Sequence, residues 1–251
     1  MISTIVRHTI HGLRESIRIM RAANLTQPSP EVLMYRGLRL ELPRSMLTDP
    51  IRDAFTKNYY ESAESDELGY LLQDGEVVLE IGAGIGFIST LCAKDSRVRK
   101  VFAVEANPEL IPICRRTYQL NQVSVELFHE MLGTEDGTAL FHLHRDFWAS
   151  SATAWNGSQQ VEVPKTSFQK RLDQISPSLL IVDIEGGEFD LFDGVQMPSV
   201  KKILMEIHQN VIGRAGVKKV FDTLSAQNFH YDQWHSSRGI VTFSKIDRDA
   251  A

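Results

Sequence analysis

The stretch Val77–Phe87, VVLEIGAGIGF, is a run of apolar residues that passes into three alternating glycines. An apolar run of this kind predicts a buried strand, and the pattern of residues 87–94 after it predicts a helix. Glycines suit the connection because the backbone there must take positive φ values and a ligand must approach it without an intervening Cβ. The stretch therefore predicts a ligand-binding turn between a strand and a helix.

The alternation of strand and helix continues through most of the chain beyond this turn. Strand patterns occupy residues 77–81, 100–105, 124–129, 179–184 and 202–208, and helix patterns occupy residues 87–94, 108–121, 189–192 and 214–227. Right-handed crossovers between such strands give a mostly parallel sheet with helices on both faces. Residues 229–234 and 240–244 predict a closing antiparallel hairpin. The predicted fold class is α/β.

The chain divides into two parts at about residue 70. Residues 1–70 are predicted to form an N-terminal extension, and residues 71–251 the main domain, with an insertion at 133–164 where the alternation lapses. Residues 1–24 place apolar side chains at helical spacing among arginines, so they predict an amphipathic helix. We expect this helix to pack on the main domain or on a second subunit of a homo-oligomer. Weak attachment to an anionic membrane surface and a lid over the site are the alternatives.

The composition fits a globular protein with an ordinary core. The chain has 251 residues, 43% of them apolar, and a net charge of −5, without the basic excess that would favour nucleic acid. Its apolar runs are shorter than the roughly 20 residues of a membrane-spanning helix. The cysteines Cys92 and Cys114 lack metal-binding spacing and favour a reducing compartment, so we expect a cytoplasmic protein.

Two classes of cofactor use a glycine turn of this type. The dinucleotide fingerprint Gly-x-Gly-x-x-Gly would need a glycine at Phe87, which disfavours a pyrophosphate-containing ligand. Glu105 ends the next strand, where its carboxylate can accept both hydroxyls of a ribose. The carboxylate of Glu80 would oppose a phosphate but suits an ammonium group. S-adenosylmethionine carries a ribose and an ammonium group, so these residues favour it.

Several short motifs give the chain a family resemblance. They are Tyr60-Glu61, Leu79–Gly86, Val104–Pro108, Thr166 with Leu172-Asp173, Ile181–Glu188 and Met205–His208. With these motifs the chain resembles the FkbM family of class I S-adenosylmethionine-dependent methyltransferases. Its most diagnostic part is the Asp-x-Glu-Gly-x-Glu segment at 183–188. The resemblance implies a Rossmann-like fold with a seven-stranded sheet, and O-methylation of a saccharide, glycolipid or secondary metabolite.

The resemblance also implies a set of cofactor-binding residues. The glycine turn is expected to line the methionine portion, the end of the second strand the ribose, and the residues after the third strand the adenine. The full set is Glu80, Gly82, Ala83, Gly84, Gly86, Phe87, Glu105, Ala106, Asn107, Glu130, Met131 and Asp183. Core packing is an equally good interpretation of Met131.

Four polar residues follow the fourth and fifth strands and are the expected catalytic residues: Asp183, Glu185, Glu206 and His208. We expect His208 to accept the proton of the acceptor hydroxyl, because imidazole titrates close to working pH. Asp183 or Glu185 is the second choice as base, and either could instead anchor the ammonium group of the cofactor. A divalent ion held by these four residues is an alternative that we rank below metal-free catalysis, because short carboxylate motifs are common.

Other functions stay open at this level. An NAD-type oxidoreductase and a non-catalytic cofactor-binding partner domain use similar turns, although Phe87 disfavours the first. The small-molecule or glycan acceptor is expected to meet residues 1–70 and 133–164. There Tyr60, Trp148 and Trp155 either line its pocket or pack in the core, and core packing is the safer interpretation.

Overall fold

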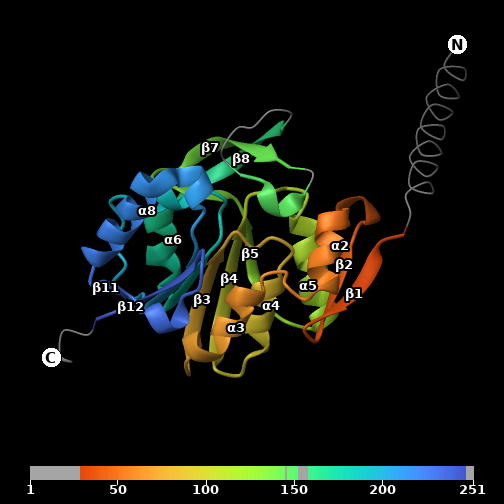
Figure 1. Ribbon diagram of the computed structural model, residues 1–251, viewed down its shortest axis with the longest axis horizontal. Coiled ribbons are helices and arrows are strands. Elements are labelled where there is room, and N and C mark those ends of the chain that lie inside the picture. Colours follow the sequence, from red (N-terminus) through yellow and green to blue (C-terminus); the bar gives the residue numbers. More distant parts are fainter. Residues whose placement is uncertain (1–28, 145, 152–157, 247–251) are drawn as a thin grey trace, which may run out of the picture.

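The computed structural model describes residues 29–144, 146–151 and 158–246 (Figure 1). The amphipathic helix expected at residues 1–24, as well as Trp155, lies outside these ranges. The described residues form a central sheet flanked by helices, with a smaller sheet, containing β7 and β8, at the top of the view in Figure 1.

The central sheet has seven strands in the order β11-β12-β10-β9-β3-β4-β5. They are β3 (Glu76–Ile81), β4 (Val98–Glu105), β5 (Glu126–His129), β9 (Leu179–Val182), β10 (Lys202–Glu206), β11 (Phe229–Tyr231) and β12 (Ile240–Lys245). β12 is antiparallel to β10 and β11, and the other neighbours are parallel. The predicted mostly parallel sheet and closing hairpin are confirmed. Strand order reverses between β3 and β9, where open α/β sheets bind their ligands.

The side chains of β3 alternate between two hydrophobic cores, because both faces of the sheet are covered by helices. Val78 packs with the helices of one face, whereas Val77 and Leu79 pack with those of the other. The first face carries α3 (Ser62–Leu71), α4 (Phe87–Lys94) and α5 (Ile111–Asn121), and the second α6 (Phe168–Ile175), α7 (Glu188–Leu191) and α8 (Gln209–Ser225). No helix in the described ranges is long and apolar enough to cross a membrane.

An N-terminal hairpin joins the core on the first face. The elements before α3 are β1 (Glu31–Tyr35), β2 (Leu38–Leu42), the short 3-10 helix η1 (Arg44–Met46) and α2 (Asp49–Thr56). β1 and β2 pair antiparallel and form a hairpin. Leu38 and Leu40 are almost fully buried in the same core as Phe87 of α4.

The smaller sheet contains three strands in the order β6-β8-β7. These strands are β6 (Met131–Gly133), β7 (Gly137–Leu143) and β8 (Gln159–Ser167), and the 3-10 helix η2 (Phe147–Ala149) follows β7. β7 and β8 pair antiparallel largely within the predicted insertion, and β6 adds to β8 in parallel. The sheet therefore extends from the end of β5 to the start of α6.

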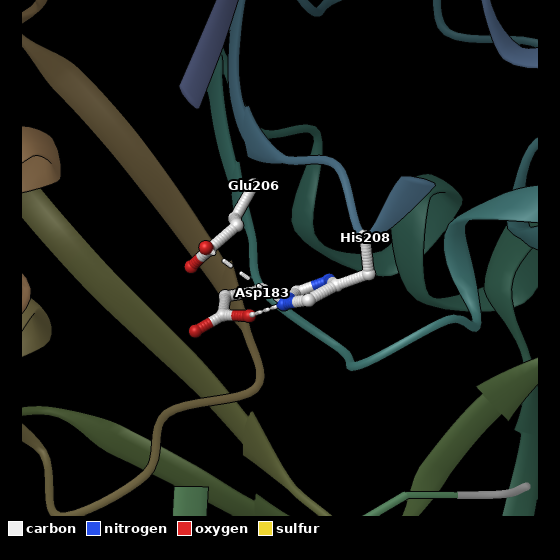
Figure 2. Close-up of side chains that lie close together, drawn as sticks. All are labelled: Asp183, Glu206 and His208. Carbon is white, nitrogen blue, oxygen red and sulfur yellow. Dashed lines mark ion pairs between the residues drawn. The ribbon is translucent and has the colours of Figure 1, made fainter. Parts of the chain in front are cut away.

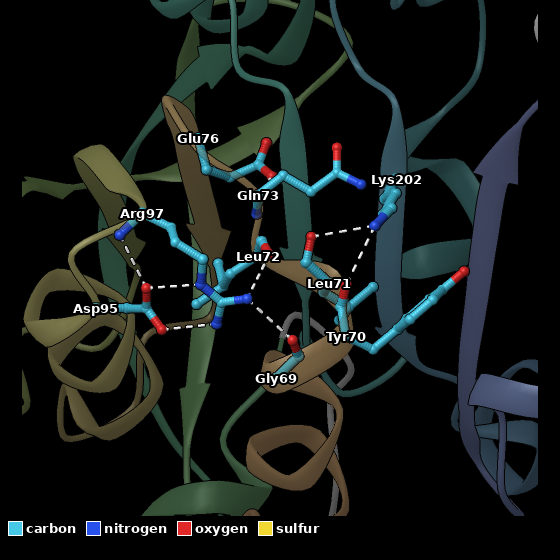
Figure 3. Close-up of polar contacts among 9 residues, drawn as sticks. All are labelled: Gly69, Tyr70, Leu71, Leu72, Gln73, Glu76, Asp95, Arg97 and Lys202. Carbon is cyan, nitrogen blue, oxygen red and sulfur yellow. Dashed lines mark hydrogen bonds and ion pairs between the residues drawn. The ribbon is translucent and has the colours of Figure 1, made fainter.

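Basic side chains cap α3 where β4 and β10 begin (Figure 3). Arg97, just before β4, donates to the carbonyls of Gly69 and Leu72, and Lys202, the first residue of β10, donates to those of Tyr70 and Leu71. Arg97 also pairs with Asp95 at 2.8 Å. The cations satisfy carbonyls that the helix leaves unpaired and complement its dipole. We call this group, Asp95, Arg97 and Lys202, the amino edge.

Candidate active site

The predicted turn joins β3 to α4, and its three glycines have φ values of 89°, 55° and 77°. A Cβ on Gly82 would lie 1.7 Å from the carbonyl oxygen of Asp183, and one on Gly86 would lie 2.8 Å from the ring of Tyr118. No side chain can occupy such positions without displacing the backbone of β9 or the Tyr118 ring. The amides of Gly82 and Ala83 donate to the Val104 carbonyl, which holds the turn against β4.

A cavity of about 480 Å³ opens where the strands end, between the glycine turn and the smaller sheet. Its volume is typical of a small-molecule site. We call it the cofactor cavity. Its lining includes Tyr60 and Glu61 before α3, Gly82 and Gly84 of the turn, Glu105 and Ala106, Glu130 and Met131, Trp148, and Asp183 with Glu185. The lining brings together most of the predicted site.

Glu105 has the position and orientation expected of the ribose-binding acid. Its Oε2 accepts from the amide of Gly84 and its Oε1 from the amide of Asn107, both at 2.7 Å. Burial raises the pKa of Glu105 to about 7, although these amide hydrogen bonds oppose the shift. Each carboxylate oxygen retains a second lone pair. Glu105 can therefore accept two more hydrogen bonds from the cavity.

Four residues of the predicted cofactor set support the turn and do not line the cavity: Ala83, Gly86, Phe87 and Asn107. Phe87 is fully buried and packs with the rings of Tyr35 and Tyr60. Asn107 orients Glu105 through its backbone amide. Their positions favour an indirect role in ligand binding, through the shape of the turn, the packing behind it and the orientation of Glu105.

Glu80 also lies away from the cofactor cavity. It shares the α4 face of β3 with Val78 because side chains alternate along a strand. There it lines a second, small cavity of about 10 Å³, is 3% exposed, and leaves its Oε2 without a hydrogen-bond partner. Burial raises the pKa of Glu80 to about 8. The expected contact of Glu80 with the cofactor ammonium group is not supported by this position.

Glu130 and Met131 both line the cofactor cavity, as predicted. Glu130 is held by Arg171 of α6 at 2.6 and 2.8 Å and by the hydroxyl of Thr166 at 2.7 Å. Sequence reasoning missed Arg171, because nothing in its local pattern separates it from an exposed helical arginine.

The four expected catalytic residues come together at the ends of β9 and β10, which are neighbouring parallel strands. Figure 2 shows Asp183 and Glu206 directed toward the ring of His208. The Nε2 atom of His208 lies 3.4 Å from Glu185, 3.7 Å from Asp183 and 3.9 Å from Glu206. We call these four residues the carboxyl edge. The predicted carboxylate and imidazole cluster is present.

The environment of His208 does not suit the role of proton acceptor that we expected for it. Its Nδ1 lies 2.8 Å from the fully buried Glu188. Burial alone would lower the pKa of His208, but hydrogen bonding to Glu185 and Glu188 and the nearby Asp183 outweigh burial and raise it to about 11. An imidazolium, with a proton on each nitrogen, has no lone pair with which to accept a further proton. Asp183 and Glu185 line the cofactor cavity, whereas His208 does not, so the second choice of base is better placed.

Two further acids belong to this region and were not predicted as site residues. Glu61 lines both cavities and Glu64 lines the small one. Burial raises the pKa of Glu61 well above its ordinary value and that of Glu64 to about 7. At the start of α3 they look like ordinary helix-dipole acids. The Tyr60-Glu61 pair in the family resemblance was the one signal that could have found Glu61.

The cofactor cavity fits S-adenosylmethionine. A Cβ on Gly84 would lie 3.4 Å from the hydroxyl of Tyr60 and 3.6 Å from the carboxylate of Glu61. Because glycine has no Cβ, this narrow space stays open to a ligand. Gly82, Gly84 and Asp183 would hold the methionine portion of the ligand, Glu105 the ribose, and Met131 the adenine. Bound there, the cofactor supplies an electrophilic methyl group.

The sheet order, the glycine turn and Glu105 define a class I S-adenosylmethionine-dependent methyltransferase. A family model described as "Methyltransferase FkbM domain" matches residues 80–238. The chain therefore belongs to the FkbM methyltransferase family, and its cofactor is S-adenosylmethionine.

Individual proteins similar to this chain match different shares of it. A putative protein N5-glutamine methyltransferase from Methanocaldococcus jannaschii is 38% identical over 55 residues, which are 22% of this chain and 27% of that protein. A putative transferase from Pyrococcus horikoshii shares the fold, with a TM-score of 0.51 and 10% identity over 87% of this chain and 73% of that one. An FkbM methyltransferase from Methylobacillus flagellatus gives a TM-score of 0.46 and 12% identity, covering 69% of this chain and 44% of its own.

Proposed function

We propose that this methyltransferase acts on a hydroxyl of a saccharide, glycolipid or secondary metabolite. The observation that carries the proposal is the pair of carboxylates, Asp183 and Glu185, in the wall of the cofactor cavity. A neutral hydroxyl is a poor nucleophile, and a carboxylate within reach can accept its proton during transfer. A cavity that holds both the methyl donor and such a base suits O-methylation.

An aromatic wall supports a ring-shaped acceptor. Phe141, Phe147 and Trp148 line the cavity beside the hydroxyl-bearing Ser150. The ring of Trp148 stacks on Tyr60 with centroids 6.2 Å apart and an interplanar angle of 24°. Flat apolar area with a polar group at its border suits a sugar or polyketide ring carrying hydroxyls.

Glu185 is the base in this proposal, and His208 is a positioning residue. Glu185 has a left-handed backbone, with φ of 48°, which turns the chain immediately after β9. Its carboxylate lies 3.4 Å from Nε2 of His208, whose other nitrogen is fixed by Glu188. His208 thus holds Glu185 at the cavity wall, where the carboxylate can reach an acceptor hydroxyl.

We also propose that residues 1–70 form a cap over the main domain at 71–251, with 133–164 as its insertion. Tyr60 and Glu61 from the first part and Phe141 from the insertion line the cofactor cavity, which supports a role for both in acceptor choice. A cytoplasmic location is part of the proposal, since the buried thiols of Cys92 and Cys114 are free.

The test is incubation of the full chain with methyl-labelled S-adenosylmethionine and metabolite extracts, followed by mass spectrometry. A labelled O-methyl product is expected. Glu185→Gln should lower kcat at least about 100-fold while the affinity for S-adenosylhomocysteine stays unchanged. Glu126→Gln, a surface carboxylate paired with Lys100, is the matched control. A methyl group found on nitrogen, as in the amide chemistry for which the Methanocaldococcus relative is named, would contradict a hydroxyl acceptor.

A further inference from the structure

Three side chains at the carboxyl edge bring metal-binding atoms together. Asp183, Glu206 and His208 each offer one ligand atom within 4.8 Å of the others (Figure 2). Nε2 of His208 lies 3.7 and 3.9 Å from the two carboxylates, which is too far for hydrogen bonds. Around an ion with ligand distances of about 2.0–2.5 Å, donor atoms lie roughly 3–4.5 Å apart. The spacing therefore leaves room for one ion.

The adjoining small cavity is an independent sign of a missing cation. Its volume of about 10 Å³ is close to the space of one water molecule, and its polar lining is acidic throughout. The acids are Glu61, Glu64, Glu80, Asp183 and Glu206. Oε2 of Glu80, which is 3% exposed, and Oδ1 of Asp183 are buried without hydrogen-bond partners. Buried oxygens are rarely left unpaired, so this group lacks a positive partner.

The protein supplies little charge to balance these acids. Among the residues that the structure describes, His208 is the one basic side chain within 4.0 Å of any of the five. Its ring is shared with Glu185 and Glu188. Burying several carboxylates beside one imidazole is costly unless some of them take up protons or another cation binds. Glu130, in the same cavity wall, shows the ordinary solution, a buried acid paired with Arg171.

We propose that Asp183, Glu206 and His208 bind a divalent metal ion of the Mg²⁺ or Mn²⁺ type at the wall between the two cavities. Two carboxylates with one imidazole form a donor set suited to such ions. Binding releases the proton from Nε2 of His208, while Nδ1 keeps its proton beside Glu188, and the ion replaces the lost positive charge next to Glu185. Asp183 lines both cavities, so the ion borders the cofactor cavity. Its role there rests on the proposed function: a nearby cation polarises the acceptor hydroxyl, which eases loss of its proton to Glu185.

Direct titration with Mn²⁺ tests the site without an activity measurement. The full chain, stripped with a chelator, is titrated with Mn²⁺ while the electron paramagnetic resonance signal of the free ion is followed. We expect one saturable site per chain. Asp183→Asn, Glu206→Gln and His208→Gln should each weaken binding at least about tenfold. Asp95→Asn removes the same charge at the amino edge and should leave the affinity within about twofold.

A cooperative urea unfolding transition, followed by circular dichroism, shows that each variant is folded. Absence of saturable Mn²⁺ binding in the parent, or equal binding by the parent and all three variants, overturns the proposal. The proposed function and the metal site can be refuted independently of each other. Methyl transfer to a hydroxyl by a chain without a Mn²⁺ site would refute only the metal, and Mn²⁺ binding by a chain that methylates only nitrogen would refute only the function.

Discussion

The two ends of the central sheet are built in opposite ways. At the amino edge, Arg97 and Lys202 satisfy four carbonyls of α3, and Asp95 is paired with Arg97. At the carboxyl edge, carboxylates crowd around one imidazole and buried oxygens of Asp183 and Glu80 lack partners. The first arrangement stabilises the fold. The second costs stability and is kept where ligands bind, as is common at functional sites.

Two individual strands, β10 and β4, also differ in charge between their two ends. β10 begins with Lys202 and ends with Glu206, and β4 follows Arg97 and ends with Glu105. Parallel strands place all their starts at one end of the sheet and all their finishes at the other, so these two strands carry bases at one end and acids at the other. The separation is not complete, because β3 and β5 begin with Glu76 and Glu126. Four predictions test how far the two ends differ.

The largest effect is expected from a methyl group in the turn. Gly82→Ala should destabilise the protein by at least about 4 kcal/mol or prevent folding, because its Cβ would overlap the carbonyl of Asp183. Gly75→Ala, at the amino end of β3, is the matched control: its φ of 80° is similar, but a Cβ there meets nothing within 4 Å. It should cost about 1–2 kcal/mol. Equal losses of unfolding free energy in Gly82→Ala and Gly75→Ala, measured with urea, would contradict the steric explanation.

Glu80→Gln should stabilise the protein on the alkaline side. Burial raises the folded pKa of Glu80 to about 8 from an ordinary 4.5, so the folded state binds the extra proton between these values. Stability is then lost as pH rises through this window. The variant should match the parent at pH 5 and exceed its free energy of unfolding by on the order of 3 kcal/mol at pH 8. A difference independent of pH in chemical unfolding would contradict the assignment.

Removing a positive charge at the amino edge should lower the stability of the protein, whereas Glu80→Gln should raise it. Arg97→Met keeps an aliphatic side chain but removes the donors to Gly69 and Leu72, so we expect a lower midpoint of urea unfolding with unchanged affinity for S-adenosylhomocysteine. Lys94→Met, an exposed position at the end of α4, is the control and should change stability by less than about 0.5 kcal/mol. Weakened ligand binding in Arg97→Met would show that the two ends are coupled.

The smallest expected effect concerns cofactor affinity. Ionised Glu105 is the better acceptor for ribose hydroxyls, and burial raises its pKa to about 7. Binding of S-adenosylhomocysteine should therefore weaken about tenfold between pH 8 and pH 6. Glu105→Gln should bind more weakly with a flatter profile, and Glu126→Gln should follow the parent. Calorimetry at several pH values measures both, and a flat parent profile would argue against contact between Glu105 and the ribose.

Sequence alone predicted the features that depend on local pattern. The apolar strand, the glycine spacing and the acid at Glu105 identified the turn and the sheet, since each is set by neighbours along the chain. The packing of Phe87 behind the turn and of Glu80 on the α4 face depends on which helix covers which face. The proton on His208 depends on carboxylates from separate segments that only the fold brings within reach.

Arg171 and Glu64 are two residues of the site region that the sequence did not predict, for the same reason. Both lie on helices whose periodicity gives no reason to separate them from surface residues, yet one neutralises Glu130 and the other joins the acidic small cavity. Counting charges in the sequence could not show that Glu61, Glu64, Glu80, Asp183 and Glu206 gather around one small cavity. Only the three-dimensional arrangement shows where a cation is missing.

The stacking of Trp148 on Tyr60 provides an optical signal for the occupancy of the site. An indole in the cavity wall loses water contacts when a solute enters, and its emission then moves to shorter wavelength. Trp234, 84% exposed, should contribute a steady background. Screening of unlabelled metabolites by fluorescence could therefore precede any knowledge of the acceptor.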